Sequence, residues 1–382
     1  MATDHTRWMQ RCLELAQRGA GYTSPNPLVG SVLVAPDGSL LGEGWHAVYG
    51  EGHAEVNAIA DAEARHGAAA LKTATLYVNL EPCSHHGKTP PCADLIVHKQ
   101  IPRVVVGMTD PFPQVAGRGL ARLRAAGIEV TSGIMTAACQ RLNEAFVQHV
   151  RTGRPLVTLK MAQTLDGQVA ARTGDARWVS GVEARMLVHR WRAELDAVLV
   201  GQRTAVVDDP ALTVRHVDGR QPLRIVLDRL GSLPPSLRLF TDVHAASTLA
   251  VVGPNVTPAY QIALESHGGR VWQVGLRDGH LDLVALLKRL GKNGTRDGRS
   301  VQSVLVEAGP GLATALWTQD LVDRLALFIA PKVLGAGIPS VHDLGHEQMA
   351  AAHTFAMHTW TPVGDDILFM GYRRPVDAAL VD

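Results

Sequence analysis

The chain has 382 residues, with 37 lysines and arginines against 36 aspartates and glutamates, and only four cysteines. This length predicts roughly two domains, and the charge balance argues against a protein held on nucleic acid by phosphate neutralisation. We expect a soluble cytoplasmic protein, because the chain shows neither a signal-peptide core nor the roughly 20 apolar residues of a membrane span. With only four cysteines, we expect no disulfide framework.

The first part of the chain alternates between helical and strand patterns. Trp8, Cys12 and Leu15 recur at helical spacing and predict a helix from Asp4 to Gly19, with Cys12 as an inert buried thiol. The other predicted elements are a strand over 28–35, a turn at 36–38 with a second strand, a helix over 53–66, a strand over 75–79, a helix from near Pro90, a strand over 103–107, a helix over 119–127 and a strand over 128–130. Together they predict an α/β sandwich.

A helix-like stretch over 139–155 ends at Gly153 and Pro155, and we place a first domain at 1–148 and a second at 149–382. Cys139 in this stretch is expected to be a second inert thiol. The second domain again alternates, with predicted strands over 156–162, 197–201, 223–228, 248–253, 303–309 and 324–331 and helices over 181–195, 281–291 and 312–320. Its first strand is not followed by a GxGxxG fingerprint, so the pattern does not support an ordinary Rossmann fold.

One histidine and two cysteines have the residue types of a catalytic zinc site. His53, Cys83 and Cys92 supply three ligands and leave a fourth position for water. Two thiolates leave the ion little net positive charge, so water there needs help from a carboxylate that does not bind the metal, and Glu55 is the candidate. The alternative is a chance coincidence, which four matching residue types make improbable.

These residues resemble the cytidine deaminase superfamily. Cys83 and Cys92 enclose eight residues, where most of that superfamily has two, and this longer loop, together with SPNPLVG at 24–30, is similar to the deaminase of riboflavin biosynthesis. The segments LKMAQTLDG at 159–167, RTAVVDDPALTVR at 203–215 and VEAGPGLA at 306–313 resemble the reductase that acts next in that pathway.

Nearly the whole chain therefore resembles the family of bifunctional riboflavin biosynthesis enzymes. The resemblance implies an N-terminal cytidine deaminase-like α/β/α domain followed by a C-terminal dihydrofolate reductase-like α/β domain, with Zn²⁺ and NADPH as cofactors. It implies zinc-dependent deamination of 2,5-diamino-6-ribosylamino-4(3H)-pyrimidinone 5′-phosphate. NADPH-dependent reduction of the ribosyl group of 5-amino-6-(5-phosphoribosylamino)uracil then gives the ribitylamino product.

The same resemblance assigns contact residues in the deaminase half. Asn26, His46, His85 and Lys88 are expected to contact the substrate, and Asn26 has the paired donor and acceptor that recognition of a pyrimidine edge requires. For His86 a solvated loop position is as probable as a function.

In the reductase half the resemblance places two sets of residues. Those expected to contact NADPH are Ala162, Trp178, Thr204, Asp208, Gly309, Pro310, Gly311, Leu312, Ala313, Thr314 and Ala315. Those expected to contact the substrate are Lys160, Arg192, Leu212, Arg215 and Glu307. Taken alone, a lysine beside a strand is usually solvated, and Asp208 with its neighbours forms a turn. A glycine-rich helix start does bind phosphate through its backbone N–H groups.

Four arginines are candidates for phosphate contacts, because a guanidinium donates two parallel hydrogen bonds. Arg192 and Arg215 are the candidates for the 5′-phosphate of the substrate, and Arg203 and Arg229 for the 2′-phosphate of NADPH. The sequence does not decide between Lys160 and Glu307 as the group that assists proton transfer during opening of the ribose ring.

Two positions depart from the family pattern. Phe112 stands where the family usually has asparagine in DPNP, and Ala176 stands where it often has serine ahead of Trp178. At Phe112 any hydrogen bond from the asparagine to the substrate is lost, and stacking of the phenyl ring is the alternative. Ala176 puts a hydroxyl contact in the reductase site in doubt, although one neutral hydrogen bond contributes only about 0.5 to 1.5 kcal/mol net.

Three other functions are compatible with parts of the sequence. They are a zinc deaminase of another base with a non-catalytic C-terminal domain, a non-enzymatic zinc protein, and a nucleic-acid editing enzyme. Glu55 argues against the second, because a structural zinc site normally has four protein ligands, and the charge balance argues against the third. We expect small pyrimidine ribotides as partners, neither nucleic acid nor a membrane, and a homo-oligomer.

Overall fold

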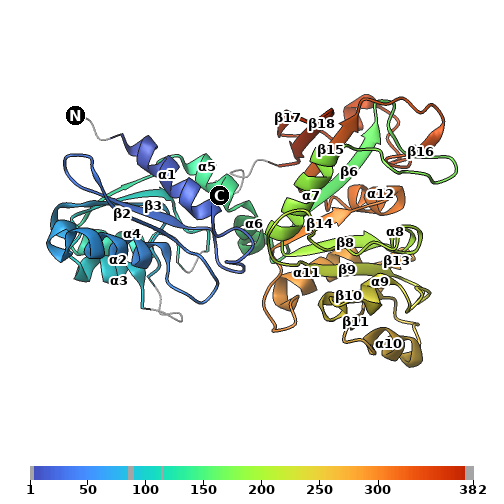
Figure 1. Ribbon diagram of the computed structural model, residues 1–382, viewed down its shortest axis with the longest axis horizontal. Coiled ribbons are helices and arrows are strands. Elements are labelled where there is room, and N and C mark those ends of the chain that lie inside the picture. The colour runs from blue at the N-terminus through green and yellow to red at the C-terminus, as the bar shows by residue number, and fades with distance from the viewer. Residues whose placement is uncertain (1–3, 85–89, 113–114, 375–382) are drawn as a thin grey trace. The chain divides into compact units, whose positions relative to one another are not determined.

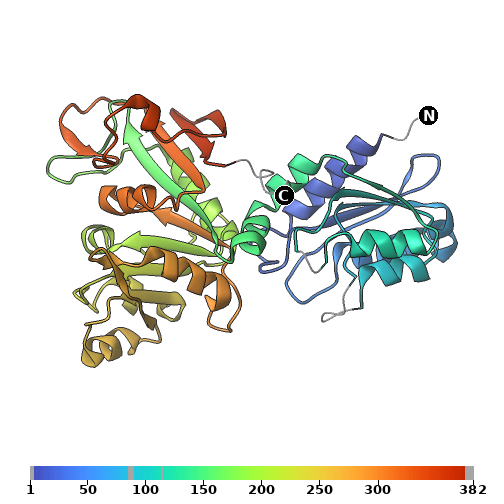
Figure 2. The same ribbon diagram turned by 180° about the vertical axis from the view of Figure 1, so that it is seen from behind.

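The computed structural model of the chain describes residues 4–84, 90–112 and 115–374. The described chain forms two compact units, which divide between Thr152 and Gly153. Figures 1 and 2 show these units from opposite sides. Within the described residues, no helix has both the length and the apolar character that crossing a membrane requires.

The first unit is built on a five-stranded sheet with the order β2-β1-β3-β4-β5. Strand β1 pairs antiparallel with both of its neighbours, and β3, β4 and β5 run parallel. Strands β1 and β3 are buried along their whole length, which explains their continuous apolar sequences. The strands are β1 (Gly30–Val34), β2 (Leu40–Trp45), β3 (Thr75–Leu80), β4 (Arg103–Met108) and β5 (Glu129–Ser132).

Helices cover both faces of this sheet (Figure 1). They are α1 (His5–Gln17), α2 (Ala54–His66), α3 (Cys92–His98), α4 (Arg118–Ala125), α5 (Thr136–Leu142) and α6 (Glu144–Thr152), with a 3₁₀ turn η1 (Ala68–Thr73). Helices α2, α3 and α4 share one apolar cluster with the sheet, and α1, α5 and α6 share the other. The predicted α/β/α sandwich is therefore confirmed.

Helix α1 begins as predicted, because the Asp4 side chain caps it by accepting a hydrogen bond from the Arg7 backbone N–H. Cys12 and Cys139 are fully buried, and burial raises the pKa of both thiols, that of Cys139 to about 12. The predicted helical stretch over 139–155 is two helices, which are separated at Asn143. The Asn143 side chain bonds the backbone of Leu28 through N–H···Oδ1 at 2.7 Å and Nδ2–H···O at 2.9 Å.

The second unit contains a nine-stranded sheet with the order β11-β10-β9-β8-β14-β6-β15-β18-β17. The strands from β11 to β15 in this order are parallel, and β18 and β17 add an antiparallel edge. The strands are β6 (Leu156–Thr164), β8 (Ala197–Gly201), β9 (Leu223–Asp228), β10 (Thr248–Val252), β11 (Arg270–Gln273), β14 (Ser303–Glu307), β15 (Arg324–Ala330), β17 (Met357–Val363) and β18 (Asp366–Tyr372). All six predicted strands are present, and the β17–β18 hairpin was not predicted.

Helices also cover both faces of the larger sheet. They are α7 (Val182–Glu194), α8 (Gln202–Asp208), α9 (Arg238–Thr241), α10 (Pro258–Glu265), α11 (Leu283–Asn293) and α12 (Pro310–Thr318). Helices α11 and α12 share one apolar cluster with the sheet (α11 is orange in Figure 2). Helix α7 packs on the opposite face, in a cluster with Leu305, and α8, α9 and α10 pack on that face in a cluster with Val198, the strand partner of Leu305.

Candidate functional site

Three candidate metal ligands meet at the helix starts of the first unit. His53 is the N-cap of α2, Cys92 is the first residue of α3, and Cys83 follows β3. Their ligand atoms all lie within 4.8 Å of one another, with His53 Nδ1 at 3.6 Å from Cys83 Sγ and 3.3 Å from Cys92 Sγ. One nitrogen and two sulfur donors suit zinc, and three protein ligands leave a fourth position open.

The two thiols of this site have different proton affinities. The hydrogen bond from Cys92 lowers the pKa of Cys83 to about 4, and the same bond, together with burial, raises the pKa of Cys92. The Cys92 backbone N–H also donates to Cys83 Sγ at 3.2 Å. Cys83 is therefore ready to bind as a thiolate, and a metal bound by both sulfur atoms displaces the proton of Cys92.

Glu55 lies in the first turn of α2, two residues after His53, with 3% of its surface exposed. Burial and the charge of Cys83 raise the pKa of Glu55 to about 7. Because this value is close to neutral pH, the carboxyl group both accepts and releases protons readily.

Asn26 and His46 lie beside the metal ligands. Asn26 Nδ2 donates to His46 Nε2 at 3.0 Å, and His46 Nδ1 donates to the Gly52 carbonyl oxygen at 3.1 Å. The His46 ring is 5.4 Å from the His53 ring, and burial lowers the pKa of His46, which favours the neutral form of this ring. His85 and Lys88, the other two predicted substrate contacts, lie outside the described residues, as does His86.

Sequence analysis missed Glu81, which directly follows β3 and precedes the Cys83 loop. Its carboxylate is 3% exposed and accepts backbone N–H groups of Asp110, Gly117 and Gly119 at 3.1, 2.9 and 2.8 Å. The carboxylate thus connects the Cys83 loop to the loop after β4, which carries Phe112 with 41% of its surface exposed. Glu81 could have been identified from the sequence as a charged residue at the end of an apolar strand, directly before a loop that carries a metal ligand.

In the second unit, a carboxylate at the end of β14, a lysine in the middle of β6 and an arginine on α7 lie together. Arg192 on α7 binds Glu307 through Nε–Oε1 at 2.6 Å and Nη2–Oε2 at 2.8 Å, and the strand register pairs Glu307 with Lys160. Burial lowers the pKa of Lys160. Although burial opposes its ionisation, the Arg192 guanidinium holds the pKa of Glu307 below its ordinary value.

A buried histidine that sequence analysis missed supports the neighbouring loop. His189 Nδ1 accepts the Arg215 backbone N–H at 3.2 Å, and Arg215 Nη1 donates to Thr213 Oγ1 at 2.9 Å. Burial, followed by the charges of Arg192 and Arg215, lowers the pKa of His189 to about 4. Leu212 is 2% exposed, and its side chain lies in the apolar core. Its φ of 51° is in the left-handed region. His189 could have been identified from the sequence, because it lies three residues before Arg192 on a predicted helix and therefore on the same helix face.

The glycine-rich segment after β14 begins helix α12. Gly309 is the N-cap and Pro310 the first helical residue, which leaves the first backbone N–H groups of the helix directed outward. A Cβ added at Gly311 would meet no atom within 4 Å, and one added at Gly309 would lie 3.7 Å from Thr204 Oγ1. This open helix start fits the phosphates of a dinucleotide.

The remaining predicted cofactor contacts differ in exposure. Ala313 lies in the apolar core, with Leu312 and Ala315 packed against it. Thr314 Oγ1 donates to the Pro310 carbonyl oxygen at 2.8 Å. Burial raises the pKa of Asp208, which follows Thr204 on α8.

Two further predicted cofactor contacts, Ala162 and Trp178, lie on the β6 side of β14, away from β8 and α8. Ala162 lies on β6 on the same face as Lys160, because residues two apart on a strand face the same way. Trp178 is 63% exposed, in the segment that also carries Ala176.

Arg203 and Arg229 are both exposed and follow the adjacent parallel strands β8 and β9. Gln202 Nε2 donates to Ser232 Oγ at 2.6 Å and connects the two loops. Buried Asp228 fixes the second loop by accepting the Ser232 N–H at 3.0 Å.

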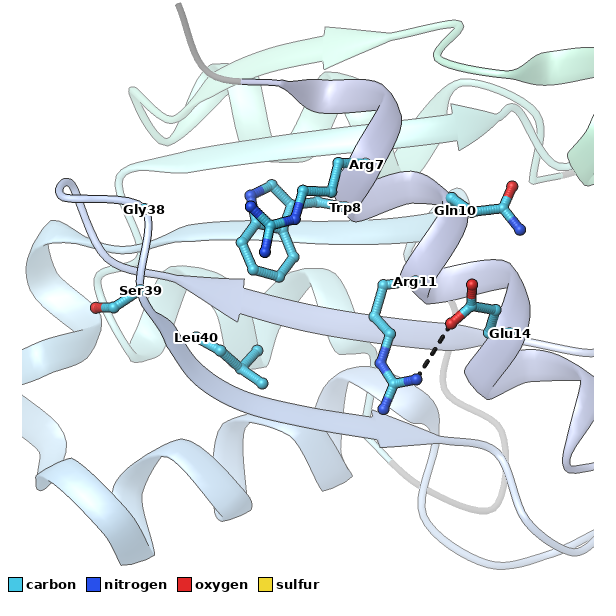
Figure 3. A pocket seen from close by; sticks show the side chains of 8 residues that line it. All are labelled: Arg7, Trp8, Gln10, Arg11, Glu14, Gly38, Ser39 and Leu40. Carbon is cyan, nitrogen blue, oxygen red and sulfur yellow. Dashed lines mark hydrogen bonds and ion pairs between the residues drawn. The ribbon is translucent and has the colours of Figure 1, made fainter. Parts of the chain in front are cut away.

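A pocket of about 590 Å³ lies between α1 and the β1–β2 turn (Figure 3). It contains none of the predicted site residues. Arg11 in its wall is already paired with Glu43 and Glu14, at 2.8 and 3.2 Å, and the Arg7 guanidinium lies 4.8 Å from the Trp8 ring centroid. Its charged groups are therefore directed at one another rather than at a common ligand.

Two family profiles match the chain. Residues 2–108 match the cytidine and deoxycytidylate deaminase zinc-binding region, and residues 155–369 match the RibD C-terminal domain. Among curated relatives, the riboflavin biosynthesis protein RibD of Escherichia coli strain K12 is 41% identical over 94% of this chain and 97% of its own length. The protein of the same name from Aquifex aeolicus is 40% identical over 96% and 98%.

Solved structures are also similar to this chain over nearly its whole length. Acinetobacter baumannii RibD, form 1, has a TM-score of 0.84 and 36% identity, with 96% of this chain and 98% of that chain covered. A diaminohydroxyphosphoribosylaminopyrimidine deaminase/5-amino-6-(5-phosphoribosylamino)uracil reductase from Thermotoga maritima has a TM-score of 0.81 and 34% identity, with the same coverage.

Proposed function

The chain belongs to the RibD family of riboflavin biosynthesis proteins, and from this membership we propose how its two units divide the work. The protein is a bifunctional enzyme, a zinc-dependent pyrimidine deaminase and an NADPH-dependent reductase. We assign deamination of the diaminopyrimidinone ribotide to the unit that ends at Thr152 and reduction of the ribosyl group to the unit that begins at Gly153. The observation that carries this assignment is the meeting of His53, Cys83 and Cys92 beside a carboxylate that is not a ligand.

In the deaminase, we assign the metal to His53, Cys83 and Cys92 and the proton transfers to Glu55. Zinc, when bound, supplies the Lewis acidity that makes a water nucleophilic near neutral pH. Glu55 takes one proton as the water oxygen adds to the amino-bearing ring carbon, and passes it to the ring nitrogen. It then takes the second proton from the added hydroxyl and passes it to the amino group, which leaves as ammonia, and its pKa of about 7 suits both transfers. A carbonyl replaces the amino group.

His46 and Asn26 position the pyrimidine in this scheme. The His46 ring uses Nδ1 to donate to Gly52 and Nε2 to accept from Asn26, which fixes the orientation of the Asn26 amide. The second Asn26 N–H and the Asn26 side-chain carbonyl oxygen can then form hydrogen bonds with the pyrimidine edge. We retain His85 and Lys88 as substrate contacts on the resemblance alone.

In the reductase, we assign proton delivery to Lys160. NADPH, when bound, supplies the hydride. The C1′–O4′ bond of the ribose opens as O4′ takes a proton from Lys160 and the exocyclic nitrogen that joins the uracil to C1′ donates its electron pair to C1′, and the hydride then adds to C1′. Glu307 is a poor donor because Arg192 keeps it ionised, and its charge instead orients the Lys160 ammonium.

For the substrate phosphate we favour Arg215 over Arg192. All three nitrogen atoms of the Arg192 guanidinium already donate hydrogen bonds. Nε and Nη2 donate to Glu307, and Nη1 donates to the Thr213 carbonyl oxygen at 3.1 Å. The Arg215 residue is exposed, but its guanidinium is partly covered, and this partial burial, followed by the like charges of Arg192 and Arg238, lowers the pKa of Arg215. A dianionic phosphate neutralises such a cluster of cations. Leu212 contributes to this site through its backbone.

For the cofactor, we place the phosphates at the Gly309 helix start and the 2′-phosphate at Arg203 or Arg229. We propose that the enzyme works in the cytoplasm, where thiols that bind zinc remain reduced, and acts on small molecules without nucleic acid.

We also propose a homo-oligomer that forms along β17. This edge strand is exposed over residues 358–362, with Trp360 58% exposed, and an exposed edge strand can pair with a strand of another chain. Sedimentation of Trp360→Lys tests this: a smaller species is expected, and an unchanged mass argues against it.

The test of the whole proposal is an assay of the purified protein with the diaminopyrimidinone ribotide and NADPH. Ammonia release and NADPH loss should both occur with the same molar yield. Ammonia release without NADPH loss would instead support a deaminase with a non-catalytic C-terminal unit.

A further inference from the structure

Trp178 is an exposed aromatic side chain with one face of its ring covered by a cation. The guanidinium carbon of Arg185, on α7, lies 4.6 Å from the ring centroid, while 63% of the Trp178 surface is exposed. The face turned away from Arg185 is therefore accessible to another flat ring. Indole faces attract both cations and flat heterocycles, so the geometry suits stacking.

The backbone that follows this indole is held by charged groups from separate elements. The Lys332 ammonium, after β15, donates to the carbonyl oxygens of Trp178 at 2.6 Å and Val179 at 3.2 Å. Charge-assisted hydrogen bonds of this kind are stronger than neutral ones.

Two more contacts complete the attachment of the segment. Arg185 Nη1 donates to the Ser180 carbonyl oxygen at 2.7 Å, and buried Asp366 on β18 accepts the Gly181 N–H at 2.7 Å. The backbone segment that carries the indole is thus fixed before any ligand binds. Such preorganisation lowers the entropy cost of binding.

We propose that Lys332 and Arg185 are positioning residues that hold the Trp178 indole as a stacking platform for the nicotinamide ring of NADPH. The inference rests on the proposed function, which places Trp178 against this cofactor.

The order of the strands identifies which end of the cofactor reaches the platform. Lys332 lies beside the end of β6, because its carbonyl oxygen accepts the Leu165 N–H at 2.8 Å. The Gly309 phosphate cradle follows β14, and Arg203 and Arg229 follow β8 and β9, on the other side of β14 from β6. The adenosine therefore extends toward β9 and the nicotinamide toward β6, where Lys160 lies beside Glu307 of β14.

The test compares the affinities of NADP⁺ and 2′,5′-ADP by calorimetry, since the second ligand lacks nicotinamide. Lys332→Met should weaken NADP⁺ binding about two- to tenfold, the range of a lost aromatic stacking contact. It should leave 2′,5′-ADP binding and deaminase activity unchanged, and Lys332→Arg should retain most of the NADP⁺ affinity. Lys288→Met, at an exposed lysine of α11, is the matched control.

Protease cleavage gives a readout that does not depend on activity. Lys332→Met should accelerate chymotryptic cleavage after Trp178, whose carbonyl Lys332 binds, and NADP⁺ should protect the wild type. Arg185→Gln is a second variant with the same expected direction in both measurements.

The outcomes separate two failures. If Trp178→Ala leaves NADP⁺ affinity unchanged, the assigned cofactor contact is wrong. If Trp178→Ala weakens NADP⁺ binding while Lys332→Met and Arg185→Gln behave like Lys288→Met, the positioning role is wrong. Equal weakening of NADP⁺ and 2′,5′-ADP would overturn the nicotinamide assignment.

Discussion

The Arg192 guanidinium holds both carboxylate oxygens of Glu307, at 2.6 and 2.8 Å, across 115 residues of sequence. The two side chains are only 10% and 16% exposed, so the pair is shielded from solvent. The reductase site therefore depends on a fixed ion pair beside Lys160, and the first prediction concerns its geometry.

Arg192→Lys keeps the positive charge but loses the planar fork, so Glu307 should lose its fixed orientation. We expect reductase kcat to fall about 10- to 100-fold, as for a misplaced catalytic group, while deaminase activity is unchanged. Arg192→Met should in addition destabilise the second unit by roughly 3 to 5 kcal/mol in denaturant unfolding, because it leaves a buried carboxylate unpaired. Arg190→Lys, on the same helix but exposed, is the control. Reduction at the wild-type rate in Arg192→Lys would contradict the role of this pair.

The pH profile of reduction tests Lys160. A lysine that donates a proton is active below its pKa, so the rate should fall as pH rises through the pKa of Lys160. Because burial lowers the pKa of Lys160, this fall should begin below the value of about 10.4 of an exposed lysine. The measurement is kcat against pH with supplied deaminated intermediate. Lys160→Gln should lack this limb along with most of the activity, and an identical limb in that variant would show that another group titrates.

The cofactor preference tests Arg203 and Arg229. A charge-assisted hydrogen bond contributes roughly 1.5 to 3 kcal/mol, so removal of the responsible arginine should raise KM for NADPH by about tenfold or more and leave KM for NADH little changed. Arg190→Ala serves as the control. If Arg203→Ala and Arg229→Ala both keep the preference for NADPH, the 2′-phosphate is bound elsewhere.

Metal analysis tests the ligand set. We expect one zinc per chain in the wild type and strongly reduced zinc in the Cys83→Ser and Cys92→Ser double variant, since serine oxygen is a much weaker zinc ligand than thiolate. Cys12→Ser, at a buried thiol of the same unit, should keep its zinc. Full zinc content in the double variant would remove these residues from the site.

The deaminase ligands could be predicted because their chemistry restricts the residue types. His53, Cys83 and Cys92 form a complete set for zinc, and the α2 and α3 helix starts on which His53 and Cys92 lie were predicted from local patterns. The five strands of the first sheet and six of the nine strands of the larger sheet were also predicted, because buried strands have continuous apolar sequences.

Contacts between distant residues could not be predicted in this way. Glu307 and Arg192 are each unremarkable alone, and only the packing of α7 on β14 brings them together. The β17–β18 hairpin was missed because β17 is exposed along most of its length and lacks the alternating apolar pattern of a half-buried strand. Asn143 interrupts a helical pattern through its contacts with Leu28, which is distant in sequence.

The central claim is that one chain carries two separable reactions, and Glu55→Gln tests it most directly. The substitution keeps the shape of the side chain but removes the proton carrier, a contribution typically worth about 10²- to 10⁴-fold in rate. Ammonia release from the diaminopyrimidinone ribotide should collapse, while NADPH-dependent reduction of supplied deaminated intermediate continues at the wild-type rate. Equal loss of both activities, or ammonia release at the wild-type rate, would contradict the account.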